Sequence, residues 1–193
     1  MRAAGWPLVG WAAVIVGGMV TAILLKYGTN EEGFHAGVYW TARTSVLLFL
    51  LPLLASPAHR LRRSRTTGWV LRNRRYLGVS FALSHTIHLA VVFLFLRSTG
   101  EGQPVPFLIV TGVAYAFLAA MVATSFDRTA RWLGPHRWRR LHVSGLYYLW
   151  LVFAYTFGTH ARDDVSSAVF ATLLMAALPF RLWALRGRSS RTS

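Results

Sequence analysis

Six long apolar segments, separated by short polar stretches, run through the chain. They cover approximately residues 6–25, 37–55, 76–96, 107–126, 141–159 and 165–185. Each is close to the ~20 residues that an α-helix needs to cross the hydrocarbon core of a bilayer. Apolar residues are continuous within each segment rather than alternating, which favours helices over the strands of a barrel. The pattern predicts an all-α membrane protein, a bundle of six transmembrane helices forming one domain over residues 1–193.

Basic residues gather in alternate connections between these segments. Of the 21 lysines and arginines, seventeen lie before the first segment, near or after the end of the last, between the second and third, or between the fourth and fifth. The other connections contain Lys26, Arg97 and Arg162, with five of the six carboxylates. Because positive connections stay in the cytoplasm, both termini are predicted there. Arginine replaces lysine almost completely, as in GC-rich bacteria, so we expect a multi-pass protein of a bacterial cytoplasmic (inner) membrane.

Charge and composition exclude several classes of protein. The net charge of +15 lies at the predicted membrane surface, where it suits the anionic headgroups of the lipid bilayer, so nucleic-acid binding is not predicted. The chain has no cysteine, which excludes disulfides, thiolate-ligated haem, iron–sulfur clusters and c-type haem. All six carboxylates fall in connections or at segment ends, which argues against a proton-coupled transporter. No glycine-rich phosphate loop follows a strand, so we expect no nicotinamide or flavin domain in this chain.

Two histidines lie in the third apolar segment and another begins the fifth. His85 and His88 are three residues apart, on one face of a helix, and His142 follows a run of arginines. An imidazole at membrane depth loses its hydration and normally has a specific partner. Imidazoles on neighbouring helices can bind haem iron from both sides. The pattern predicts b-type haem and electron transfer across the membrane.

Two other interpretations of these histidines stay open. In the first, the chain is a non-redox membrane transporter or structural partner, whose histidines only form hydrogen bonds between helices. In the second, which the lack of carboxylates within the bundle disfavours, the imidazoles hold a non-haem metal.

Arg43 is a charged residue within the second apolar segment. An arginine in a membrane span is costly without a partner. The sequence predicts that a haem propionate is this partner; the alternative is that the side chain extends to the membrane surface.

Several short motifs resemble those of one known family. Residues 74–79 read Arg-Arg-Tyr-Leu-Gly-Val, with His88 ten residues after the glycine. This is similar to the Arg-Arg-x-Leu-Gly-Leu…His signature of the ferric reductase-like transmembrane domain family. Residues 138–142, Trp-Arg-Arg-Leu-His, resemble the Trp-x-x-Leu-His start of that family's fifth helix. Residues 41–43 and 56–57 resemble its Thr-Gly-Arg and Thr-Pro-Leu-Arg elements.

The similarity covers the second to fifth segments. It is greatest to the short bacterial branch of the family, the haem-binding membrane subunits of the periplasmic methionine sulfoxide reductase system. The resemblance implies b-type haem between the third and fifth helices. It also implies electron transfer from a cytoplasmic flavin reductase or quinol to an acceptor on the outer side, which would make the chain an oxidoreductase subunit.

The resemblance also implies roles for individual residues. His88 and His142 inherit the position of iron ligands. Arg74 and Arg75 are candidates for binding the propionates of haem or the phosphate of FMN, with quinone as a further candidate cofactor. At Gly78, the missing side chain leaves space for the edge of a porphyrin.

The chain departs from the family in the fifth helix. Relatives carry a further histidine about thirteen residues after the first one of that helix; here Tyr155 takes this place and the next histidine is His160. We therefore expect one haem rather than two. By helical rise His88 lies ~20 Å beyond Arg75, whereas His142 is only two residues beyond the last arginine before it. The pairing of ligands stays open, with His85, Tyr155 and His160 as alternatives.

Overall fold

The computed structural model describes residues 4–100 and 102–186, so Arg2, Glu101, Arg188 and Arg191, which contribute to the charge asymmetry above, lie outside the described residues. The described chain is helical throughout apart from short connections. Its helices are α1 (Trp6–Tyr27), α2 (Glu31–Leu61), α3 (Arg65–Arg72), α4 (Arg74–Thr99), α5 (Val105–Ala123), α6 (Asp127–Leu133), α7 (Pro135–Thr159) and α8 (Val165–Arg186). The prediction of an all-α protein is confirmed.

Five of the described helices are long and apolar enough to cross a membrane, namely α1, α2, α4, α5 and α8. The sixth predicted segment corresponds to α7, which has 25 residues but is less apolar than the other five. Three arginines lie near its start and several tyrosines and tryptophans follow, and these residue types lower its mean hydropathy. The structure therefore supports a multi-pass membrane protein.

The basic connection between the second and third predicted segments is mostly helical. Helix α2 continues through Pro57 to Leu61, and α3 follows almost at once. A capping box explains the start of α3, because Ser64 accepts a hydrogen bond from the backbone N–H of Thr67 and the Thr67 hydroxyl accepts one from the backbone N–H of Ser64. The arginines, Pro57 and Gly68 of this stretch predicted a loop, whereas the structure shows helix over most of it.

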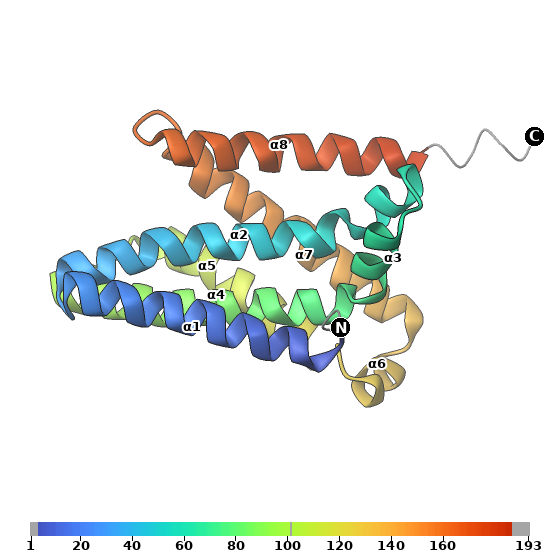
Figure 1. The fold of residues 1–193 in the computed structure, drawn as a ribbon, viewed down its shortest axis with the longest axis horizontal. Coiled ribbons are helices and arrows are strands. Elements are labelled where there is room, and N and C mark those ends of the chain that lie inside the picture. Colours follow the sequence, from blue (N-terminus) through green and yellow to red (C-terminus); the bar gives the residue numbers. More distant parts are fainter. Residues whose placement is uncertain (1–3, 101, 187–193) are drawn as a thin grey trace, which may run out of the picture.

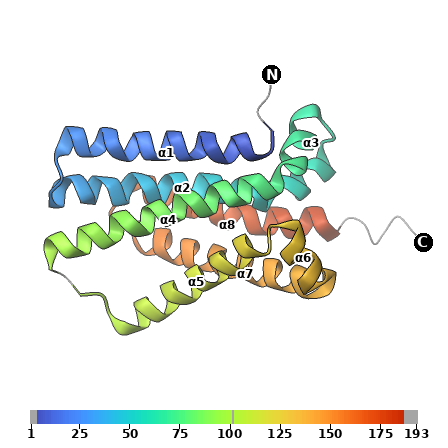
Figure 2. The same cartoon turned by 90° about the horizontal axis from the view of Figure 1, so that it is seen from below.

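Helix α2 occupies the centre of the bundle (Figures 1 and 2). It packs most extensively against α4 and also contacts α1 and α8, while α7 packs between α5 and α8. The contact between α2 and α4 is close, since a Cβ added to Gly37 would lie 2.8 Å from Cγ1 of Val91. Buried apolar side chains from α2, α4, α5, α7 and α8 form the core; they include Val46, Phe49, Leu53, Phe81, Leu118, Leu149, Phe153 and Leu174.

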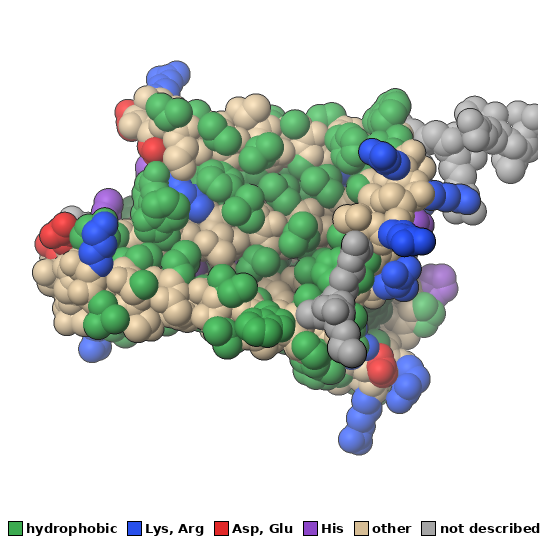
Figure 3. Space-filling view, viewed as in Figure 1, with side chains coloured by type: hydrophobic (Ala, Val, Ile, Leu, Met, Phe, Trp, Pro, Cys, Tyr) green, Lys and Arg blue, Asp and Glu red, His purple; other side chains and the backbone are tan. Residues whose placement is uncertain are grey.

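Charged side chains gather mainly at the two ends of the bundle, with hydrophobic side chains covering the face between them (Figure 3). The start of α1 and the end of α8 lie at the same end as α3 and α6 (Figure 1). We call this end, which carries α3 and α6, the basic end. The α7–α8 connection at the opposite end holds Asp163 and Asp164. The fold thus brings the separate arginine-rich connections of the sequence to one side.

Candidate functional site

His88 is held by a threonine of the neighbouring helix. Its Nδ1 lies 2.8 Å from Oγ1 of Thr41, which is fully buried in α2. The Thr41 hydroxyl donates its proton to the carbonyl of Gly37, at 2.6 Å, so its oxygen is left to accept from Nδ1–H of His88. This tautomer places the lone pair of the imidazole on Nε2, which has no hydrogen-bond partner among the described residues.

His85 lies against His88 and is enclosed by aromatic rings. Its ring stacks 5.1 Å from that of Tyr115 and 5.3 Å from that of His88. The Tyr115 hydroxyl donates to the backbone carbonyl of His85 at 3.1 Å, which fixes α5 against α4. Nδ1 of His85 is buried without a hydrogen-bond partner. Because an unpaired buried nitrogen is rare, this atom is a candidate for a ligand contact.

His142 has the same kind of partner as His88, but through its other nitrogen. Nε2 of His142 lies 3.0 Å from Oγ1 of Thr124, whose hydroxyl donates to the carbonyl of Ala120 at 2.7 Å. The imidazole therefore donates from Nε2–H. Trp138 stacks on the ring at 4.1 Å and donates from Nε1 to the backbone carbonyl of Thr124. Binding a metal through Nε2 requires His142 to release Thr124.

A cavity of about 540 Å³ opens beside His142 at the basic end of the bundle. Its apolar lining residues include Phe49, Phe81, Leu118, Leu146 and Leu149. Five arginines also line it, namely Arg60, Arg74, Arg75, Arg139 and Arg181, and we call it the basic cavity. Phe81 also stacks on His85, with ring centroids 5.6 Å apart, so Phe81 separates the cavity from His85, on which His88 stacks in turn.

Gly78, Arg74 and Arg75, three candidates from the sequence, all line the basic cavity. A Cβ added to Gly78 would meet nothing within 4 Å, which leaves open space at this position. Arg75 forms an ion pair with Asp127 at 2.6 Å. Arg74 donates only to the neutral hydroxyl of Ser56, at 3.3 Å. Of the two arginines, Arg74 is therefore the one whose charge has no carboxylate partner among the described residues.

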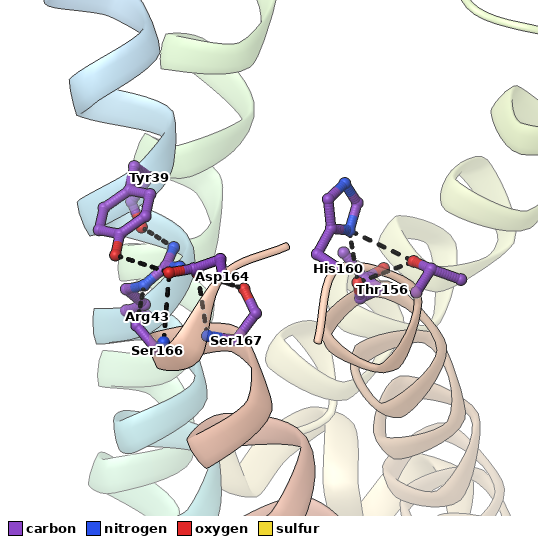
Figure 4. Close-up of polar contacts among 8 residues, drawn as sticks. Tyr39, Arg43, Thr156, His160, Asp164, Ser166 and Ser167 are labelled. Atoms are coloured by element: carbon purple, nitrogen blue, oxygen red, sulfur yellow. Dashed lines mark hydrogen bonds and ion pairs between the residues drawn. The ribbon is translucent and has the colours of Figure 1, made fainter. Parts of the chain in front are cut away.

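Arg43 is buried, and its partner is a carboxylate of the protein (Figure 4). The guanidinium forms an ion pair with Asp164, before α8, and donates to Ser166 at 2.6 Å and to the Tyr39 carbonyl at 2.9 Å. The pKa of Asp164 is lowered, chiefly by the hydrogen bond from the Ser167 hydroxyl and less by the charge of Arg43. Arg43 thus has an anionic partner within the protein, whereas the sequence predicted a haem propionate at this position.

Tyr155 and His160 lie away from this group. The side chain of Tyr155 is 68% exposed on α7, and no described hydrogen bond involves its hydroxyl. His160 caps the end of α7 and is exposed, with Nδ1 2.8 Å from the carbonyl of Thr156 (Figure 4). The structure therefore gathers His85, His88, His142, Arg74 and Gly78 around the inner bundle and the basic cavity, and leaves these two candidates outside.

Sequence reasoning missed Thr124 and Arg181. Thr124 lies near the end of the fourth apolar segment, and nothing local to it signals a contact with a histidine eighteen residues later. Arg181 was counted only as a topology signal, yet it is among the most buried charged residues of the described chain. The described residues contain no group of three or more His, Cys, Asp or Glu side chains that could hold a bare metal ion.

The comparisons with known proteins agree with this picture. The chain is 28% identical over 172 residues to the protein-methionine-sulfoxide reductase heme-binding subunit MsrQ of Ralstonia nicotianae, covering 82% of this chain and 74% of that protein. It is 30% identical over 150 residues to the MsrQ subunit of Cronobacter sakazakii, covering 67% of this chain and 73% of that protein. No family model matches the chain. No solved structure matches it either.

The fold and the site define a multi-pass bacterial membrane protein with imidazoles buried in its helical bundle. The chain belongs to the MsrQ family. The resemblance noted from residues 74–88 and 138–142 is thereby confirmed at the level of the family.

Proposed function

We propose that this protein binds b-type haem and carries electrons across the cytoplasmic membrane of a bacterium. The observation that carries the proposal is the hydrogen bonding of the two ring nitrogens of His88. Its Nδ1–H is held by Thr41, which leaves Nε2, the nitrogen that commonly binds haem iron, without a hydrogen-bond partner in the described part of the chain. A metal-binding histidine normally donates its other ring N–H in this way, and such a partner fixes the orientation of the ring.

The residues of the basic cavity fit a haem. The cavity volume of about 540 Å³ is within the roughly 300–1,000 Å³ of cofactor sites. Its apolar walls suit a flat macrocycle, Gly78 leaves open space, and the arginines suit the propionates. His142 lines the cavity and the His85–His88 pair adjoins it through Phe81. These three histidines are the proposed source of iron ligands, with one haem expected. When bound, haem supplies a one-electron carrier.

The proposed topology has six membrane-crossing helices, with both termini in the cytoplasm. Support comes from the basic end, where α3, α6, the start of α1 and the end of α8 lie together. An alkaline phosphatase fused to the C-terminus should therefore be inactive, whereas one inserted in the α7–α8 connection should be active. The reverse pattern would contradict the orientation.

The donor and acceptor follow from this orientation and from the family. Electrons would enter at the basic end from a flavin reductase or from quinol. They would leave on the outer side to a redox acceptor. The relatives are named as subunits of a protein-methionine-sulfoxide reductase, so the proposed acceptor is a partner subunit that reduces methionine sulfoxide in proteins.

The absorbance spectrum of the purified protein tests the proposal. Protein from haem-replete cells should show a Soret band that shifts and sharpens on reduction with dithionite, and a pyridine haemochrome assay should give about one haem per chain. His88→Ala should lose or alter this spectrum. His59→Ala is the control, because His59 also contacts a threonine, Thr67 at 3.1 Å, but lies near the end of α2.

The same experiment separates the electron-transfer proposal from the non-redox alternative. If the histidines only join helices, purified protein is colourless and His88→Ala merely lowers its thermal stability. Colourless protein from haem-replete cells would overturn the proposed function.

A further inference from the structure

Arg181 of α8 is anchored to a backbone carbonyl that α2 cannot use. Pro57 has no N–H, so the carbonyl of Leu53, four residues earlier, lacks its helical partner. Arg181 donates from Nη1 to this oxygen at 2.6 Å. Leu53 and Pro57 are fully buried and Arg181 is 7% exposed. The guanidinium is therefore fixed deep at the junction of α2 and α8.

The remaining donors of Arg181 have no acceptor among the residues that the structure describes. Nε is buried and makes no hydrogen bond. The ion pairs of the described residues join Arg43 to Asp164 and Arg75 to Asp127, and neither involves Arg181. Its other described contact is with the ring of Tyr147, 6.0 Å away. A buried cation without an anion is costly, so a ligand is expected to supply the negative charge.

Arg74 brings a second unpaired charge to the same place. It lines the basic cavity together with Arg181, and the two guanidinium charges are close enough to repel each other. The one described hydrogen bond of the Arg74 side chain goes to the hydroxyl of Ser56. Two like charges from α4 and α8, turned to one cavity, suit a ligand that carries two acidic groups or one dianion.

The rest of the cavity defines the ligand to which those acids belong. Phe49, Phe81 and Leu149 form apolar walls beside the arginines, and His142 supplies an imidazole. A small inorganic anion leaves these walls and this imidazole without a partner. A porphyrin with two propionates provides a partner for the apolar walls, for the imidazole and for the two arginines.

We propose that Arg181 and Arg74 bind the propionate carboxylates of the haem. This inference rests on the proposed function and deepens it by assigning a residue of α8 to cofactor binding. The same arginines could hold the phosphate of a lipid headgroup, which presents similar anionic oxygens, so the test must separate these two sources.

The test compares haem with its dimethyl ester, in which both propionates are uncharged. Full-length protein from haem-deficient cells is titrated with each in detergent micelles, with the Soret band as readout. Wild type should bind haem at least about tenfold more tightly than the ester. Arg181→Gln and Arg74→Gln should bind haem more weakly but the ester as wild type does. Arg63→Gln, an exposed arginine outside the cavity, is the matched control.

A second readout uses the haem already in the purified protein. Loss of a nearby positive charge favours ferric over ferrous iron, so the midpoint potential of Arg181→Gln should become more negative, while Arg63→Gln leaves it unchanged. Arg181→Lys keeps the charge and should shift the potential less.

Each outcome bears on one proposal. Wild type that binds neither porphyrin overturns the proposed function itself. Wild type that binds haem and ester equally keeps the cofactor but overturns the role of Arg181 and Arg74, and points to a lipid phosphate as their anion. This comparison needs no variant, so it can overturn the proposal even if Arg181→Gln does not accumulate.

Discussion

The hydroxyl of Thr41 links α2 to α4, because it accepts a hydrogen bond from His88 of α4 and donates one within α2. It donates to the carbonyl of Gly37 at 2.6 Å within α2 and accepts from Nδ1–H of His88 at 2.8 Å across the contact with α4. Because the hydroxyl has a single proton, the first bond dictates the direction of the second. The tautomer of a buried histidine is thus fixed by a residue 47 positions away in the sequence.

Thr41→Val removes the acceptor for the His88 N–H and keeps a similar side-chain shape. Loss of such a partner typically costs 10–100-fold in metal affinity, so we expect haem affinity to fall by about that factor. The imidazole also becomes less basic, which should raise the midpoint potential of the retained haem. Redox titration and haem content measure the two effects, and Thr41→Ser should restore both.

Thr44→Val is the matched control for this prediction. Thr44 lies one turn nearer the basic end of α2 and donates to the Trp40 carbonyl at 3.0 Å, but it contacts no histidine. Its variant should keep wild-type haem content and potential. If Thr41→Val and Thr44→Val have the same haem content and the same midpoint potential, Thr41 has no specific role.

Tyr155 and His160 are expected to lie outside the haem site. The Tyr155 side chain is exposed, and His160 is at the end of α7 away from the basic cavity. Tyr155→Phe and His160→Ala should therefore leave the oxidised and reduced spectra unchanged. Tyr115→Phe should alter them, because the Tyr115 ring stacks on His85 and its hydroxyl bonds the His85 carbonyl. A spectral change in Tyr155→Phe that matches loss of an iron ligand would reinstate this residue.

The sequence predicted those parts of the structure that depend on local pattern. Apolar runs near 20 residues predicted the long helices, although Gly134, with φ +77°, and Pro135 begin α7 six residues before the apolar segment at 141–159. The histidines, Gly78 and Arg74 were recognised because polar or small residues stand out in apolar segments. Contacts between helices could not be predicted in this way. Thr124 meets His142, and Arg181 meets the Leu53 carbonyl, only because the helices pack against one another.

The Arg43–Asp164 ion pair gives a prediction about stability rather than cofactor binding. Asp164→Asn removes the charge that faces the buried guanidinium, so the melting temperature of the purified protein should fall. Arg43→Gln should also lower it while haem content stays as in wild type. Asp163→Asn is the control, because no described side-chain interaction involves Asp163. Loss of haem from Arg43→Gln but not from Asp164→Asn would support a propionate partner for Arg43 instead.

The Asp164 carboxylate also leads us to predict that the protein loses stability at acidic pH. Hydrogen bonds from Ser167 and Ser166 and the charge of Arg43 keep the folded pKa of Asp164 below its unfolded value of about 3.9. A lowered pKa stabilises the fold above the unfolded value, and this contribution is lost as the pH falls through the folded one. Melting temperatures measured from pH 7 to pH 3 should therefore decline more steeply below about pH 4 in wild type than in Asp164→Asn. If the melting temperatures of wild type and Asp164→Asn fall in parallel as the pH is lowered, the lowered pKa of Asp164 does not contribute to stability.

Because α2 and α4 are in close contact, we predict that Gly37→Ala causes a steric clash and that a second substitution relieves it. Alanine forms helices better than glycine by about 1 kcal/mol, so Gly37→Ala should stabilise α2 if space allows. Its Cβ would instead lie 2.8 Å from Cγ1 of Val91, a stiff, buried side chain. We expect Gly37→Ala to destabilise the protein by about 1–3 kcal/mol. Adding Val91→Ala should recover most of this loss, with a non-additive double-mutant cycle.

The clash should also reach the haem site, because Gly37 and Thr41 are one turn apart and Val91 follows His88 by three residues. Separation of α2 from α4 lengthens the contact between Thr41 and His88. The midpoint potential of Gly37→Ala should therefore shift in the same direction as that of Thr41→Val, and Val91→Ala should reverse the shift when it restores stability. A destabilised Gly37→Ala protein with an unchanged potential would show that the helix contact and the tautomer of His88 are independent.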